Sequence, residues 1–147
     1  MPRILVAFAT LAVLATTGVS QSFAWDNNRA IVQQYGNYNA AGVGQTGRGN
    51  FAHVYQNGGR NTAIANQSGQ GNYAVTGQMG NGNYGVTYQA GSRNIAGIAQ
   101  FGNGNSAITQ QSGHDNISAT IQVGNGHQAQ TYQSGNGNVS VIVQGGW

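Results

Sequence analysis

Residues 94–105 read NIAGIAQFGNGN, and this stretch contains the pattern that decides the fold. It begins and ends with asparagine, with Gln100 six positions after the start and Gly102 two positions later. Between them, the alternate residues Ala96 and Ile98 are small or β-branched. Alternation at every second residue is the side-chain period of a β-strand, and glycine with asparagine is typical of a turn. The stretch therefore predicts one strand followed by a tight turn.

The same register recurs every eleven residues from Asn28 onward, through eleven units without an insertion. The glutamine of each unit is Gln34, Gln45, Gln56, Gln67, Gln78, Gln89, Gln100, Gln111, Gln122, Gln133 and Gln144. The first position is Asn28, Asn39, Asn50, Asn61, Asn72, Asn83, Asn94, Asn105, Asn116 and Asn138, with His127 in the tenth unit. A fixed short period predicts stacked repeats.

A second period of 22 residues overlies the first. The residue after glutamine is mostly large in odd units, as at Phe101, and small in even units, as at Ser112. One coil is therefore expected to contain two strands on chemically different faces. The predicted fold is all-β: a β-solenoid of stacked 22-residue strand–turn–strand coils, with two facing parallel sheets and about 4.8 Å between coils. On polymerisation it would become cross-β amyloid.

The alternation places asparagine, alanine, valine or threonine, and glutamine inside the coil. A buried carboxamide is costly unless it is hydrogen-bonded. At constant coil spacing, each carboxamide can donate to its copy in one neighbouring coil and accept from its copy in the other. We therefore expect all the glutamines and asparagines of the two columns to form structural ladders, with His127 as a tolerated substitute.

Composition agrees with a secreted repeat protein. Glycine (25), asparagine (18) and glutamine (17) dominate, charged residues make up 5%, and cysteine is absent. Residues 1–24 resemble a secretory signal peptide, with Arg3, an apolar run at residues 4–13 and a cleavage site ending at Ala24. The apolar run is too short for comfortable membrane insertion, so stable insertion is not expected. The repeat domain is predicted to be 25–147.

The residue content leaves little material for chemistry. Asp26 and Asp115 are the only carboxylate side chains, and His53, His114 and His127 do not share one repeat position. We therefore predict no enzyme activity, catalytic residue, cofactor or metal site. The arginines are scattered without a basic patch, so nucleic-acid binding is not expected.

The ends of the predicted solenoid lack a helix, a proline or a charge cluster that would serve as a cap. Unpaired strand edges are templates for another chain, so a polymer is expected. The alternative is a monomeric secreted solenoid of the ice-binding type, which would need an outward row of threonine. Outward aromatic residues could bind dyes or surfaces, but lateral fibre packing is favoured for Phe51, Tyr73, Tyr84, Tyr88 and Phe101.

The register Asn-x-Ala-x-Val/Ile-x-Gln-x-Gly-x-x-Asn, as it stands at residues 94–105, resembles the curlin repeat, and the resemblance covers residues 28–147. It implies a structural subunit of curli, an extracellular amyloid fibre at the bacterial cell surface that serves biofilm matrix, adhesion and colonisation. It also implies self-association, a nucleator or major-subunit partner, and outer-membrane secretion machinery. The family's glycine-rich N-terminal stretch is absent. Residues 139–143 lack the basic character of the minor, nucleating subunit, so the major subunit is favoured and the nucleator remains the alternative.

Overall fold

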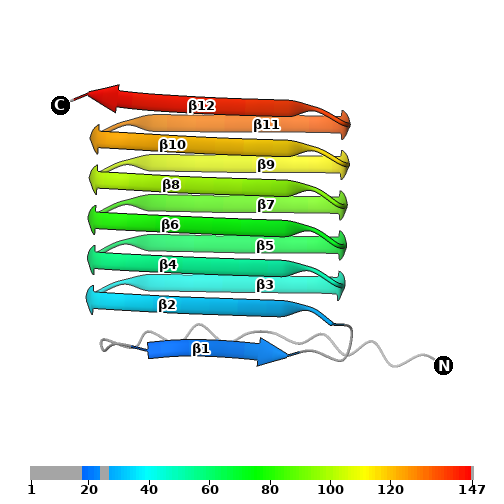
Figure 1. The fold of residues 1–147 in the computed structure, drawn as a ribbon, viewed down its shortest axis with the longest axis horizontal. Coiled ribbons are helices and arrows are strands. Elements are labelled where there is room, and N and C mark those ends of the chain that lie inside the picture. Colours follow the sequence, from blue (N-terminus) through cyan, green and yellow to red (C-terminus); the bar gives the residue numbers. More distant parts are fainter. Residues whose placement is uncertain (1–17, 24–26, 147) are drawn as a thin grey trace.

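The computed structural model of the chain describes residues 18–23 and 27–146. This part of the chain contains twelve β-strands and no helix, and the strands stack like the rungs of a ladder (Figure 1). Their bounds are β1 Gly18–Phe23, β2 Arg29–Asn37, β3 Ala40–Arg48, β4 Phe51–Gly59, β5 Thr62–Gln70, β6 Tyr73–Asn81, β7 Tyr84–Ser92, β8 Ile95–Asn103, β9 Ser106–His114, β10 Ile117–Asn125, β11 Gln128–Asn136 and β12 Val139–Gly146.

The strands form two sheets, which we call sheet A and sheet B. Sheet A has the order β1-β2-β4-β6-β8-β10-β12, and sheet B has the order β11-β9-β7-β5-β3. From β2 onward every pair is parallel, and each residue pairs with the residue 22 positions away, as Gln100 does with Gln78 and Gln122. The predicted solenoid with two parallel sheets and a 22-residue coil is therefore confirmed.

The space between the sheets is filled by small and amide side chains. In β4 the buried residues are Ala52, Val54 and Gln56, and their neighbours in sequence point outward. Across the described chain, buried polar side chains outnumber buried apolar ones. A core this thin offers little apolar volume, so its stability depends heavily on satisfying those amides.

The strands are longer than the sequence suggests, because the ladder continues through the glycine that was expected to begin the turn. Strand β8 runs through Gly102 to Asn103, and the chain bends only at the next two residues. Gly102 has φ +119°, and a Cβ added there would overlap the carbonyl oxygen of Gly124 in the next coil. Glycine is thus required at this position both by backbone conformation and by the close approach of stacked coils.

One strand lies outside the repeat. Strand β1 pairs antiparallel with β2, from Gly18 opposite Gln34 to Phe23 opposite Arg29. It falls within the predicted signal peptide at 1–24. Residues 1–17 and 24–26, including the predicted cleavage site, lie outside the described residues. In the uncleaved chain, β1 therefore occupies the outer edge of β2.

Candidate functional site: the amide ladders and the strand edges

The structure places the predicted glutamines in two columns inside the solenoid. In sheet A the Nε2 of each glutamine donates to the Oε1 of the glutamine one coil further toward the C-terminus, from Gln34 through Gln144. Sheet B contains the same chain of bonds from Gln45 through Gln133. The N–O distances are all between 2.7 and 2.9 Å. Every bond points in the same direction along the stack.

From Gln45 onward, the second hydrogen of each ladder glutamine donates to a carbonyl oxygen of the other sheet. Nε2 of Gln111 in β9 donates to the carbonyl oxygen of Ile95 in β8, at 3.0 Å. Nε2 of Gln100 in β8 likewise donates to the carbonyl oxygen of Tyr84 in β7, at 3.0 Å. One side chain thus bonds within its own sheet and across the core. Asparagine, one methylene shorter, would not reach both partners.

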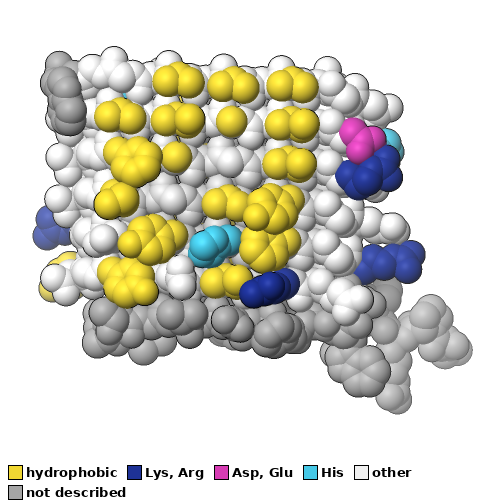
Figure 2. All heavy atoms as spheres, in the orientation of Figure 1, with side chains coloured by type: hydrophobic (Ala, Val, Ile, Leu, Met, Phe, Trp, Pro, Cys, Tyr) yellow, Lys and Arg dark blue, Asp and Glu magenta, His cyan; other side chains and the backbone are white. Residues whose placement is uncertain are grey.

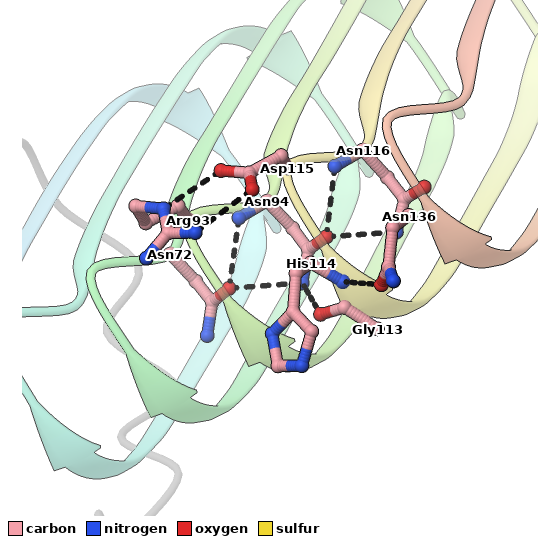
Figure 3. A network of polar contacts seen from close by, with 8 residues as sticks. All are labelled: Asn72, Arg93, Asn94, Gly113, His114, Asp115, Asn116 and Asn136. Atoms are coloured by element: carbon pink, nitrogen blue, oxygen red, sulfur yellow. Dashed lines mark hydrogen bonds and ion pairs between the residues drawn. The ribbon is translucent and has the colours of Figure 1, made fainter.

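The asparagine columns stabilise the corners. Oδ1 of Asn94 accepts from both the backbone N–H and the Nδ2 of Asn116, at 3.1 and 3.0 Å. Nδ2 of Asn94 also donates to the carbonyl oxygens of Ala90 and Gly113. Figure 3 shows Asn72, Asn94 and Asn116 at successive coils on one side of the stack. The bonds from one asparagine of this column to the next donate toward the N-terminus, opposite to the glutamine ladder.

His127, which replaces asparagine in the tenth unit, makes some of the hydrogen bonds that the asparagines make. Its backbone N–H donates to Oδ1 of Asn105 at 3.0 Å. Its Nε2 lies 3.1 Å from the carbonyl oxygen of Val123 and 3.2 Å from that of Gly146. These carbonyls stand 4 residues before and 19 residues after it, the offsets that the amide nitrogen of Asn94 also uses. The imidazole reproduces the corner bonds but has no counterpart to the Oδ1 acceptor.

The ladders leave complementary atoms at the two ends of the stack. At the β11 and β12 end, Gln133 and Gln144 each use one Nε2 hydrogen on a carbonyl, and no described residue accepts the other. At the β2 and β3 end, no described residue donates to the Oε1 of Gln34 or Gln45. The outer edges of β3, β11 and β12 pair with no strand in the described part of the chain. One end therefore presents donors and the other presents the matching acceptors.

Two features of the turns did not emerge from the sequence reasoning. Nε and Nη2 of Arg93 donate to the two carboxylate oxygens of Asp115 at 2.7 and 2.8 Å, on the solvent side of one corner (Figure 3). The hydrogen bond from Arg93 lowers the pKa of the Asp115 carboxyl below its usual value. Asn81, Asn103 and Asn125 form a short exposed amide ladder. The members of each set are 22 residues apart in the sequence, and this spacing could have predicted that they lie next to each other in successive coils.

The threonines of the fifth repeat position are inside the solenoid. Thr76, Thr87, Thr109, Thr120 and Thr131 are buried, so they form no outward row of the kind that an ice-binding face needs. Their hydroxyls, together with that of Ser118, are also the buried side-chain polar atoms for which the described residues provide no hydrogen-bond partner. Every buried carboxamide, by contrast, has a partner. The amides rather than the hydroxyls therefore hold the coils in register.

A search of residues 18–23 and 27–146 for chemistry found no group of three or more histidine, cysteine or acidic side chains placed to hold a metal ion. The same residues include no helix that could span a membrane. The arrangement that remains is a set of one-directional hydrogen-bond ladders that end at open strand edges. Such an arrangement can hold copies of the same coil.

Comparison with known proteins gives one match. Residues 26–58 match the family model described as the curlin associated repeat. That segment contains β2, β3 and most of β4. Strands β5 and β6 pair with β3 and β4 in the same 22-residue register, and the later strands continue it. No curated protein and no solved structure matches the chain.

Proposed function

We propose that the chain, whose residues 26–58 match the curlin associated repeat, belongs to the curlin family, and that residues 25–147 are the structural subunit of a secreted extracellular amyloid fibre of the curli type. Curlin repeats and the β-solenoid fold are structural rather than catalytic, and self-assembly into fibres is what the family implies. The finer proposal is a major, fibre-forming subunit that serves biofilm matrix, adhesion and surface colonisation.

The observation that carries this proposal is the direction of the glutamine ladders. Because all bonds point the same way, a second copy translated along the stack places its Gln34 Oε1 where the free Nε2 hydrogen of Gln144 can donate to it. The same translation presents the backbone of its β2 to the open edge of β12. In sheet A, growth thus repeats a contact that already occurs between coils. Sheet B has five repeat strands against six in sheet A, so the joint leaves one strand position open between β11 and β3 of the second copy.

Under this proposal, removal of the predicted signal peptide, residues 1–24, permits assembly. Strand β1 lies within residues 1–24 and occupies the outer edge of β2. Cleavage after Ala24 would remove this strand and free the edge that the incoming β12 needs. Export and maturation would then precede polymerisation, and the partners would be other copies of the chain, a nucleator subunit and an outer-membrane secretion apparatus.

The test is the behaviour of purified residues 25–147 in solution. We expect conversion to sedimentable fibres after a lag, with diffraction spacings of about 4.7–4.8 Å along the fibre and about 10 Å between sheets. The uncleaved chain should convert more slowly, because β1 blocks one growth edge. A mature chain that stays monomeric for days at tens of micromolar would refute the fibre proposal.

A further inference from the structure

The outer surface of sheet A is apolar over four consecutive strands. We call the outward residues of β6, β8, β10 and β12 the apolar face, and Figure 2 shows them as rows of hydrophobic side chains. They are Tyr73, Val75, Gly77 and Met79, then Ile95, Gly97, Ala99 and Phe101, then Ile117, Ala119, Ile121 and Val123, then Val139, Val141, Val143 and Gly145. The Tyr73 hydroxyl is the only polar side-chain group among these sixteen positions.

The opposite surface is different. The outward residues of β9 and β11 in sheet B are mainly serine and glutamine, as at Gln110 and Gln130. Charged side chains lie near the turns, as Arg93 and Asp115 do, or on β2, as Arg29 does. Strand β7 of sheet B has outward Tyr84 and Tyr88, but its neighbour β9 is polar at Gln110. The extended apolar surface over four successive strands is therefore on sheet A.

The apolar face also has relief. Ile95 and Ile117 form one line of side chains along the stack, and Met79 and Phe101 form another; all four are 41–45% exposed. Between these lines the residues Gly77, Gly97, Ala99 and Ala119 are small, and at Gly77 and Gly97 an added Cβ would meet no atom within 4 Å. The inner positions Val75, Ile121, Val141 and Val143 are larger. The face therefore presents two ridges, which run in the direction in which coils are added, with a lower area between them at the small residues.

The apolar face has the extent of a contact surface. Its four strands, about 4.8 Å apart, with about seven residues across at about 3.3 Å each, cover about 19 by 23 Å, or roughly 440 Å². Two such faces together would bury about 900 Å² for each pair of chains, and a fibre repeats that contact at every pair along its length. A contiguous exposed apolar patch of a few hundred Å² is often a site of interaction.

The spacing of the repeat determines which partner can bind the apolar face. Side chains along each ridge recur once per coil, so only a partner with the same spacing stays in register over the length of a fibre. A second copy has that spacing, and its own apolar face buries no charge against this one. We propose that the apolar face packs against the apolar face of a second copy, so that the fibre is two solenoids thick. This rests on the proposed fibre function.

The experiment compares the same substitution on the two faces. Ile117→Lys places a charge on one ridge of the apolar face, and Ile108→Lys places it on an outward position of β9 in sheet B. Mass per unit length of the fibres, measured by dark-field scanning transmission electron microscopy, should fall about twofold for Ile117→Lys. It should stay at the wild-type value for Ile108→Lys. Ile117→Thr, which keeps a β-branched side chain, should shift part of the fibre population to the lower mass.

The outcomes separate the two proposals. A wild-type fibre with the mass of one solenoid, or equal masses for wild type and Ile117→Lys, overturns the face-to-face pairing. So does a fall in mass confined to Ile108→Lys. If Ile117→Lys does not fold, Ile117→Thr decides, and an unchanged mass for it overturns the pairing. Elongation of wild-type seeds by each variant is measured in parallel. Normal elongation with halved mass supports both proposals, and a wild type that forms no fibres removes both.

Discussion

Gln110 and Gln111 are adjacent in β9, and they allow the glutamine ladder to be tested with one chemical change. Gln111 is 1% exposed, whereas Gln110 points outward and is exposed. Gln111 accepts from Nε2 of Gln89 at 2.9 Å and donates to Oε1 of Gln133 at 2.8 Å and to the carbonyl oxygen of Ile95 at 3.0 Å. Gln111→Ala removes all three bonds, and Gln110→Ala removes none that the structure records.

The magnitude follows from the groups that lose their partners. One N–H of Gln89, the Oε1 of Gln133 and the carbonyl oxygen of Ile95 remain in a dry core. Each such loss costs about 1–3 kcal/mol, so Gln111→Ala should lower the free energy of unfolding by about 3–9 kcal/mol. Gln110→Ala should change it by less than about 0.5 kcal/mol.

The assay is guanidinium unfolding of residues 25–147, followed by circular dichroism at concentrations too low for polymerisation. The midpoint should fall for Gln111→Ala with little change in slope, and Gln110→Ala should overlie the wild type. Equal midpoints for the two variants would refute the claim that the inward amides hold the coils together. Water that enters the space left by Gln111 would place the loss at the lower end of the range.

Three further predictions concern other positions. Thr109→Val removes a buried hydroxyl without a described partner and should stabilise the fold by about 1–2 kcal/mol, whereas Thr62→Val on the outer surface should be close to neutral in the same unfolding assay. Gly102→Ala should cost more than about 4 kcal/mol, because the new Cβ overlaps the carbonyl oxygen of Gly124, whereas Gly104→Ala, with open space around it, should cost about 1–2 kcal/mol; equal losses would contradict the close approach of the coils. Because Arg93 lowers the pKa of Asp115, the folded state favours the ionised carboxyl, so this pair stabilises the fold above the ordinary value of 3.8 and the benefit is lost as the pH falls through the lowered pKa. The stability difference between wild type and Asp115→Asn, measured by thermal melting, should therefore be small at neutral pH, since the pair is exposed, and should shrink in acid; a difference that grows in acid would contradict the assignment.

The sequence alone determined the coil. An eleven-residue period with glutamine and glycine in every unit permits only stacked strands, and the alternation of side chains settles which residues point inward. The 22-residue overlay shows that Phe101 and Ser112 lie on different faces. These conclusions need only local periodicity, because in a solenoid each residue's neighbour is its own copy in the next coil.

Only the tertiary structure decided how the amides are used. Periodicity shows that Gln111 meets Gln89 and Gln133, but not that its second hydrogen reaches the Ile95 carbonyl in the other sheet, nor that the glutamine ladders and the buried asparagine ladders point in opposite directions. Those facts depend on the distance and offset between sheets A and B, which are set by the corners. The same holds for Arg93 and Asp115, whose pairing requires two turns to be stacked in one orientation. It holds for the apolar face as well, because its ridges form only when four separate strands lie side by side.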